Sequence, residues 1–360
     1  MKNKIYIYPL LIIFLAYCSP KKEIKNTKIE LNDFEEIIGN KISSFDNINS
    51  DGLMYSFNND TLFEIDLNTQ KLKKTYYKFD VEGLKSELNE QFIKDSSQGL
   101  FNDLDYIWEL DNYEIYSLKS GTDNKITGLI DIELNSKIKG TPIKTYYLGV
   151  AILSNQKIDF ILYQKLINDF NESFQSKVNN FNIYDNHIIY FTTKNLGSDS
   201  VKASVKHMDL KSKSIKELAN FEYNKYYSKD FKTRSLAPIE SIQNKNKIFY
   251  TNNEQIWSID KKTKNHELIL NLEPHFKDSL IKISHFAIEK NKIYLQISGC
   301  HKDSSNQKFK TNKLIYQYDI QTKELNISKK LDEYGVIKLV RDNKLYIIKE
   351  NEEKIWVDIL

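Results

Sequence analysis

The chain has 360 residues, of which 40% are hydrophobic and 28% are charged, an ordinary globular composition with enough apolar mass for a core. Its formal net charge is +3, and Lys2 and Lys4 supply two of these charges from a segment that we expect to be removed. The remaining chain is close to neutral, which excludes the strong positive field of a nucleic-acid-binding protein.

The N-terminus combines a short positive region, Met1 to Lys4, with an apolar run, Ile5 to Tyr17, that is too short to span a bilayer. Leu15-Ala16-Tyr17-Cys18 follows at its end. The segment resembles a bacterial lipoprotein signal peptide, with Leu15 and Ala16 matching the lipobox and Tyr17 departing from its small residue. The resemblance implies cleavage after residue 17 and acylation of Cys18, with palmitate among the attached lipids. A plain secretory signal or an N-terminal anchor helix are the alternatives.

The residues after Cys18 bear on localisation. Ser19 is not the Asp that retains such lipoproteins in the inner membrane, so the resemblance implies an outer membrane lipoprotein, facing the periplasm or the cell surface. Residues 18–27 are polar and charged, which is typical of a flexible tether. Cys300 is the only other cysteine, and we expect no disulfide because lipid would occupy Cys18.

Two phrases recur along the rest of the chain. In the first, alternating apolar residues end in an acidic residue, and Thr or Ser follows three positions later. It occurs at 62–72, 130–138, 205–215, 256–263 and 314–325, and its start recurs at 355–360. Asp that opens a tight turn accepts backbone N–H groups, so the phrase predicts structural rather than catalytic roles for Asp66, Asp209, Asp260 and Asp319. Glu133 and Ser136 occupy the same register in the 130–138 copy.

The second phrase is a turn with Asn or Asp followed by an apolar-aromatic strand. It occurs at 51–55, 111–116, 185–190, 244–250, 290–294 and 342–346. Each copy pairs with one copy of the first phrase, and together they describe a four-stranded blade of a β-propeller. The predicted fold is therefore an all-β propeller with six blades. Seven blades are the alternative, if the hairpin of Tyr146–Leu153 and Ile158–Tyr163 forms its own blade.

The first phrase resembles the repeats of bacterial TolB-like and quinoprotein-like propellers. In those repeats a Gly usually follows the Thr, in the left-handed position of the turn, where this chain has Gln70, Lys264 and Lys323. The resemblance argues for a propeller, not for a cofactor, because no complete quinoprotein repeat with its Gly and trailing Trp is present.

The ends of the domain, residues 28–360, are expected to meet. The last unit stops after its third strand, and Lys28–Phe34 alternates apolar and polar residues, so this segment could supply the fourth strand and remove an open edge. Apolar residues at helical spacing predict one or two short helices between blades, at Val81–Lys94 and Lys165–Val178.

Catalytic and metal-binding motifs are absent from the sequence: it has no Cys-x-x-Cys, His-Glu-x-x-His, glycine-rich phosphate loop or Gly-x-Ser-x-Gly. Cys300, His301 and Asp303 form one local cluster, in a stretch, Ser298–Asn312, that we interpret as a solvated loop. We predict no catalytic residue, metal or cofactor.

The loop Glu222–Pro238 combines aromatic and cationic side chains. Tyr226, Tyr227 and Arg234 are the candidate contacts for a protein or glycan partner, although the loop could instead fold onto its own blade. The long connections, at 80–103, 196–201, 222–238, 273–282 and 299–312, are expected to share one face of the ring.

The leading hypothesis is a monomeric, non-enzymatic binding or scaffolding lipoprotein. An extracytoplasmic propeller hydrolase of glycans or esters, with an axial acid or metal site, is the alternative. Inner-strand His, Asp or Glu gathered around the axis would favour the hydrolase, whereas an apolar or Lys- and Asn-filled axis would favour the binding module.

Overall fold

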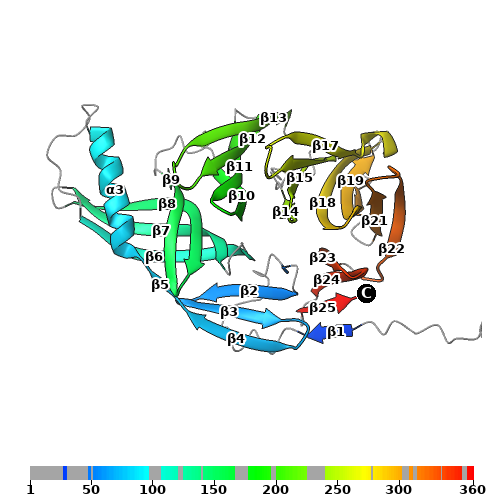
Figure 1. Cartoon of the computed structure of the whole chain (residues 1–360), viewed down its shortest axis with the longest axis horizontal. Helices are drawn as coiled ribbons and strands as arrows, with labels where there is room; N and C mark the ends of the chain where they lie inside the picture. The colour runs from blue at the N-terminus through cyan, green and yellow to red at the C-terminus, as the bar shows by residue number, and fades with distance from the viewer. Residues whose placement is uncertain are drawn as a thin grey trace, which may run out of the picture.

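The computed structural model describes residues 27–30, 48–49, 52–96, 107–120, 125–138, 141–166, 177–195, 200–224, 240–276, 279–301, 308–310, 314–333, 335–350 and 355–360. These residues form six small sheets arranged around a central axis (Figure 1). The fold is a six-bladed β-propeller, as the repeats predict.

The blades are numbered in chain order. Blade 1 contains β2 (Leu53–Asn58), β3 (Thr61–Asp66) and β4 (Lys71–Tyr76), and blade 2 contains β5 (Lys78–Phe79), β6 (Ile107–Ser120), β7 (Ile126–Ile138), β8 (Thr141–Ser154) and β9 (Lys157–Leu166). Blade 3 contains β10 (Lys177–Tyr184), β11 (His187–Asn195), β12 (Ser200–Asp209) and β13 (Ile215–Asn224). Blade 4 contains β14 (Ser241–Gln243), β15 (Lys247–Asn252), β16 (Gln255–Asp260) and β17 (His266–Asn271). Blade 5 contains β18 (Ser279–Glu289), β19 (Lys292–His301), β20 (Lys308–Lys310), β21 (Leu314–Asp319) and β22 (Leu325–Lys330). Blade 6 contains β23 (Val336–Arg341), β24 (Lys344–Glu350), β25 (Ile355–Ile359) and β1 (Thr27–Glu30).

Blade 6 joins the two ends of the described chain. β1 is its fourth strand and pairs antiparallel with β25, with Thr27 opposite Ile359 and Glu30 opposite Trp356. Ile29 is buried in one apolar cluster with Met54 and Ile65 of blade 1, so this N-terminal strand also packs toward the first blade. The pairing covers the edge that β25 would otherwise expose.

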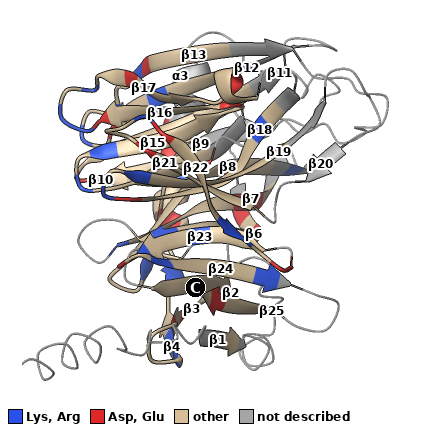
Figure 2. Ribbon diagram, turned by 90° about the vertical axis from the view of Figure 1, so that its right-hand side faces the viewer, with Lys and Arg blue, Asp and Glu red and all other residues tan. Residues whose placement is uncertain are grey.

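The ring has two distinct faces. In blades 3, 4 and 5, which we call the regular blades, short turns join the first two strands and the last two strands, and all of these turns lie at one end, the turn face. The described ends of the strands that lead from one to the next of blades 3, 4, 5 and 6 lie at the opposite end, the loop face. Figure 1 looks onto the turn face, and Figure 2 shows it at the left edge.

Blade 2 departs from the predicted pattern. Asp111 and Asn112 lie inside β6, and Glu133 and Ser136 lie inside β7, so neither phrase forms a turn there. The hairpin that could have been a seventh blade is β8 and β9 of this same sheet. Longer continuous pairing with neighbouring strands has overridden the local turn signal in both places.

A parallel strand attaches blade 2 to blade 1. β5 pairs in parallel with β9, and the backbone N–H of Lys78 donates to the carbonyl oxygen of Gln156 at 2.9 Å. The adjacent N–H of Tyr77 donates at 2.8 Å to the carbonyl oxygen of Asp60, in the β2–β3 turn, which lies at the other end of β3 from the Asp66 turn and so at the loop face. The Asn155–Gln156 turn therefore lies at the loop face, and blade 2 runs in the opposite sense to the regular blades.

One of the two predicted helices is present. α3 (Val81–Ser96) matches the segment predicted at Val81–Lys94, and its Leu84 and Leu88 pack in the apolar core of blade 2. The second is wrong at both ends, since residues 165–166 belong to β9 and residues 177–178 to β10, while 167–176 lie outside the described residues. The described ends of the segment pair with neighbouring strands, and this pairing overrides their helical spacing. One turn of 3-10 helix, η3 (Glu273–His275), precedes β18.

Among the described helices, none is long and apolar enough to cross a membrane.

Candidate functional site

The repeated aspartates lie at the tight turns between the last two strands of blades 1, 3, 4 and 5. Oδ1 of Asp260 accepts the backbone N–H groups of Lys262 at 3.0 Å and Thr263 at 2.7 Å, and the Thr263 hydroxyl at 3.0 Å. Equivalent bonds to the second and third residues onward are made by Asp66, Asp209 and Asp319. These hydrogen bonds hold the pKa of each carboxyl below its usual value. All four aspartates serve the turns, as predicted.

The residue that follows Thr or Ser in each turn has a left-handed backbone. The φ angles are 54° at Gln70, 54° at Lys213, 63° at Lys264 and 63° at Lys323. Glycine adopts this conformation without strain, whereas a side chain raises its energy. The chain therefore places long polar side chains at the strained position of every such turn, and in three of the four that side chain is a lysine.

A polar cluster near the axis joins three blades. Nζ of Lys119, at the end of β6, donates to Oδ1 of Asn180 and to the Phe181 carbonyl oxygen at 3.0 Å, both on β10. The same ammonium group lies 3.4 Å from the carbonyl oxygen of Ser241 on β14. Nδ2 of the buried Asn182 donates to the Ser241 hydroxyl at 2.6 Å. A β6 bulge, with Ser117 at a φ of 52°, precedes Lys119 and breaks the strand alternation. We call these four residues, Lys119, Asn180, Asn182 and Ser241, the axial cluster.

Two further side chains join the next blades. Glu240, just before β14, accepts the backbone N–H of Phe286 at 3.1 Å, and its other oxygen lies 3.3 Å from Nδ1 of His285 on β18. The buried Gln296 of β19 donates to the Gly335 carbonyl oxygen at 2.6 Å and accepts the Ile337 N–H at 2.9 Å. These inner-strand polar groups are used in contacts between blades. His285 is thus a strand residue paired with Glu240.

The described axial cluster differs in composition from the axial acid or metal site of the hydrolase alternative. Lys, Asn and Ser side chains form the axial cluster, and Glu240 with His285 is a single acid–imidazole pair rather than a gathering of acids. Within the described ranges, no three His, Cys, Asp or Glu side chains come together as a metal site would require.

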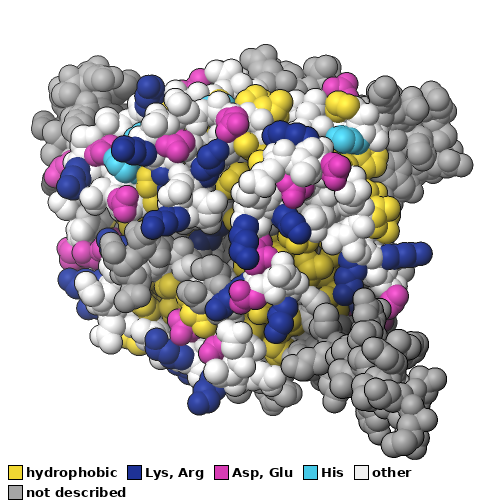
Figure 3. Space-filling view, turned by 45° about the vertical axis from the view of Figure 1, so that its right-hand side comes forward, with side chains coloured by type: hydrophobic (Ala, Val, Ile, Leu, Met, Phe, Trp, Pro, Cys, Tyr) yellow, Lys and Arg dark blue, Asp and Glu magenta, His cyan; other side chains and the backbone are white. Residues whose placement is uncertain are grey.

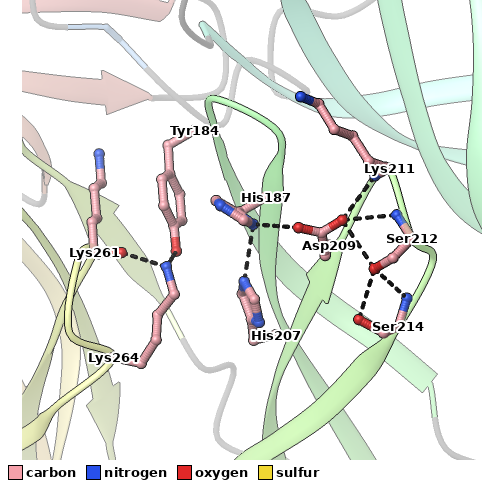
Figure 4. A network of polar contacts seen from close by, with 9 residues as sticks. All are labelled: Tyr184, His187, His207, Asp209, Lys211, Ser212, Ser214, Lys261 and Lys264. Carbon is pink, nitrogen blue, oxygen red and sulfur yellow. Dashed lines mark hydrogen bonds and ion pairs between the residues drawn. The ribbon is translucent and has the colours of Figure 1, made fainter.

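A second polar cluster lies on the turn face of blade 3 (Figure 4). Nδ1 of His187 is 3.2 Å from Nε2 of His207 and 3.5 Å from Oδ2 of Asp209. Because one ring nitrogen holds at most one proton, Nδ1 either donates to Asp209 or accepts from His207. Burial lowers the pKa of His207, and the positive charges of Lys264 and His187 lower it further. His207 therefore favours its neutral form near pH 7.

Two lysines from the turn of blade 4 approach the same place. Nζ of Lys264 donates to the hydroxyl of Tyr184 and to the carbonyl oxygen of Lys261. Nζ of Lys264 and Nζ of Lys261 lie 4.7 Å and 5.1 Å from the centroid of the Tyr184 ring. Burial lowers the pKa of both lysines, with Asp185 opposing that shift at each. Tyr184, His187, His207, Lys261 and Lys264 form what we call the cationic cluster, whose chemistry suits an anion.

Neither cluster was found from the sequence. Residues 119, 180, 182 and 241 come from three blades and become neighbours only once strand order and register are known. For the cationic cluster one local signal exists: Lys264 occupies a left-handed turn position, which glycine adopts most easily, so an unusual side chain is presented there.

Every predicted contact or lipidation residue lies outside the described residues: Cys18, Tyr226, Tyr227 and Arg234. The ends of their loop are described, since β13 ends at Asn224 and β14 begins at Ser241. Both described ends therefore lie at the loop face, between blades 3 and 4. The Ser298–Asn312 interpretation needs correction, because Ser298–His301 continues β19 and Lys308–Lys310 is β20, which pairs with it. Edge pairing has ordered a polar stretch that composition alone suggested was a loop.

Comparisons with known proteins give only distant similarity. No family model matches the chain, and no curated protein is significantly similar to it. Among solved structures, the extracellular domain of the hybrid two-component system BT4673 from B. thetaiotaomicron has a TM-score of 0.40 and 8% identity, with 93% of this chain and 42% of that one covered. This chain thus spans less than half the length of that protein chain.

Two other structures cover the chains more evenly. A chain of the mitotic checkpoint complex has a TM-score of 0.41 and 6% identity, with 92% of each chain covered. The calcium-binding protein regucalcin from Agrobacterium tumefaciens has a TM-score of 0.39 and 7% identity, with 86% of this chain and 87% of regucalcin covered. With every TM-score below 0.5, these similarities assign neither a family nor a function.

Proposed function

We propose that this protein is a non-enzymatic lipoprotein of the outer membrane, anchored through Cys18, whose propeller binds a protein or glycan partner at the loop face. The observation that carries the proposal is the use of the axis. Its polar side chains bond neighbouring blades to each other, so they form a rigid scaffold and leave recognition to the ends of the ring.

The position of β1 supports the choice of face. Thr27 pairs with Ile359, and Ile359 pairs in turn with Tyr346. Tyr346 lies just after the Asp342–Asn343 turn, which is on the turn face. The chain preceding Thr27 therefore leaves the ring at the turn face. A short tether to a lipid at Cys18 then directs the loop face, with its longer connections, away from the membrane.

The anchor is tested by Cys18→Ala. We expect the substitution to remove the mature protein from the membrane fraction or to block its maturation, and mass spectrometry of the wild-type N-terminal peptide to show acyl chains on Cys18. A mature Cys18→Ala protein that remains in the membrane fraction would contradict acylation at this residue.

The recognition face is tested by affinity capture of partners with the wild-type protein, followed by quantitative binding. The variant Tyr226→Ala, Tyr227→Ala, Arg234→Ala should weaken binding at least about tenfold, the effect of losing one or two interface hot spots. Lys157→Ala, Lys329→Ala and Lys330→Ala, at the loop-face ends of blades 2 and 5, form the matched variant and should alter binding less. If the triple aromatic-arginine variant binds normally while turn-face substitutions abolish binding, the faces are assigned wrongly.

A further inference from the structure

We propose that the turn face is a docking surface for the phosphate headgroups of anionic lipids, so that the propeller lies with this face on the membrane that anchors it. The inference rests on the proposed anchorage at Cys18 and adds an orientation and a ligand chemistry to it.

The first argument is the length and exit point of the tether. β1 begins at Thr27 on the turn face, as its pairing with Ile359 requires. Only nine residues lead from Cys18 to Thr27, and even fully extended they reach about 30 Å. A lipid at Cys18 would therefore keep the turn face within about 30 Å of the headgroups, the diameter of a small domain. Whenever the tether is less than fully extended, the turn face lies closer to the membrane.

The second argument is the distribution of exposed lysines. Lys211 of blade 3, Lys245 and Lys262 of blade 4, Lys290 and Lys323 of blade 5, and Lys344 of blade 6 are exposed on turns or strand ends of this face. Figure 2 shows blue turns along the left edge of the ribbon, and Figure 3 shows lysine side chains projecting over the obliquely viewed face. The lysines extend over four consecutive blades, so a flat anionic surface could contact several of them together.

The acidic groups of the same face are arranged differently. The side chains of Asp209, Asp260 and Asp319 are half-buried and accept hydrogen bonds from their own turns. Asp185, Glu267, Glu324 and Asp342 are exposed and reduce the field. Glu267 forms an ion pair with Lys247 at 3.1 Å, and Asp342 lies 3.7 Å from Arg341. The outermost charges are therefore mainly ammonium groups, although the whole chain is nearly neutral.

The cationic cluster provides a more enclosed place on this surface. Lys261 and Lys264 both lie beside the ring of Tyr184, next to His187 and His207 (Figure 4). The half-buried ammonium groups are less fully hydrated than exposed ones, which lowers their pKa. A phosphate oxygen would restore favourable interactions of these ammonium groups and raise their pKa.

The test is a lysine-labelling experiment on the wild-type protein reconstituted through its own anchor. One sample uses vesicles of phosphatidylcholine alone, and the other uses phosphatidylcholine with about 30 mol% phosphatidylglycerol, an anionic lipid that gives the surface a negative potential. A water-soluble amine reagent acylates accessible lysines, and mass spectrometry gives the rate for each residue. We expect Lys211, Lys245 and Lys262 to react several-fold more slowly in the anionic vesicles, while Lys157, Lys329 and Lys330 at the loop face react equally in both.

A charge-reversal variant tests whether these lysines cause the docking. A lysine near an anionic membrane adds about fivefold to surface partitioning, so Lys211→Glu, Lys245→Glu, Lys262→Glu should weaken it by about 100-fold or more. Protection of the unaltered Lys290 and Lys323 should then disappear. The matched variant Lys157→Glu, Lys329→Glu, Lys330→Glu should keep that protection. Salt at about 1 M reduces the screening length to about 3 Å, and it should therefore abolish the protection of these lysines in the wild-type protein.

The outcomes separate this inference from the proposed anchorage. Vesicle-bound protein whose turn-face and loop-face lysines react equally would overturn the headgroup surface and leave the anchorage standing. Equal protection in neutral vesicles would also overturn it, because the tether alone would then explain the orientation. Protection that inorganic phosphate removes at constant ionic strength would replace the membrane surface with a site for free phosphate. Protein that does not associate with vesicles at all would overturn both proposals.

Discussion

Blade 4 and blade 2 occupy the same ring but end their strands in different ways. In blade 4 the strands have three to six residues, and Asp260 closes the tight turn after the third strand. In blade 2 the strands β6 to β9 have 10 to 14 residues and run through positions where the sequence suggests turns. Local turn chemistry thus sets the length of the strands in blade 4. In blade 2, pairing with neighbouring strands extends them past the predicted turns.

The outer sides of the two kinds of blade differ as well. Outer strands elsewhere expose large apolar side chains, with Tyr76 at 61%, Ile215 at 55% and Ile327 at 61% exposure. On blade 2, α3 covers the sheet and Leu84 and Leu88 are each only 3% exposed. The long strands of this blade therefore have an additional apolar layer, and its stability depends on contacts far apart in the chain.

The largest expected effect is at this helix. Leu88→Ala removes a buried side chain from the cluster around Tyr147 and Phe160 and should lower the free energy of unfolding by about 2–5 kcal/mol. Ile327→Ala, on the exposed outer strand of blade 5, is the matched variant and should change it by no more than about 0.5 kcal/mol. Urea unfolding followed by circular dichroism measures both. Equal losses would show that α3 adds no specific stabilisation to blade 2.

The next effect concerns the contact between blade 2 and its neighbours. Lys119→Met keeps the aliphatic stem but leaves Asn180 Oδ1 and the Phe181 carbonyl oxygen without this donor, which should cost about 1–3 kcal/mol in unfolding free energy. Lys144→Met, on the exposed surface of the same blade, removes ion pairs with Asp111 and Glu133 and should cost less than about 1 kcal/mol. A smaller loss at residue 119 than at residue 144 would contradict a connecting role for the axial cluster.

The same contrast explains how far the sequence could predict the fold. The Asp260 and Asp319 turns are local, since donor and acceptor lie within three residues, and their sequence phrase identifies them. Asp111-Asn112 and Glu133 with Ser136 carry similar phrases, yet they continue β6 and β7. Their outcome depends on strands more than ten residues away, and a local pattern does not contain that information.

The candidate sites have the same limit. Lys119 meets Asn180 and Ser241 only because a bulged β6 lies beside the first strands of blades 3 and 4. Lys264 reaches Tyr184 across the boundary between two blades. Sequence reasoning located the turns that present such residues but not the partners that tertiary structure supplies.

Acid should lower the stability of the protein through the turns that the repeated aspartates close. The carboxyls of Asp66, Asp209, Asp260 and Asp319 have lowered pKa values because their turns donate hydrogen bonds to them. A carboxyl whose pKa is lowered by folding stabilises the protein at pH values above its ordinary pKa of 3.8. This stabilisation is lost as the pH falls through the pKa of the folded state. Melting temperatures measured between about pH 5 and 2 should therefore fall. A variant with Asn at all four positions should show a shallower fall, and an unchanged slope would remove these turns as the cause.

The smallest expected effect isolates the strain of a single turn residue. Lys323 has a φ of 63°, which glycine adopts freely, so Lys323→Gly should raise the free energy of unfolding by about 0.5–1 kcal/mol after the greater unfolded-state entropy of glycine is included. Glu324 is the next residue and is not among the positive-φ positions, so Glu324→Gly should instead lower it by about 0.5–1 kcal/mol. Urea midpoints of the two variants give the comparison directly. If Lys323→Gly is also destabilising, the lysine side chain contributes more to the fold than its backbone strain costs, and the turn face has retained it for stability. If it is stabilising, Lys323 does not contribute to stability. That result is expected when the charge of Lys323 acts in binding at the turn face.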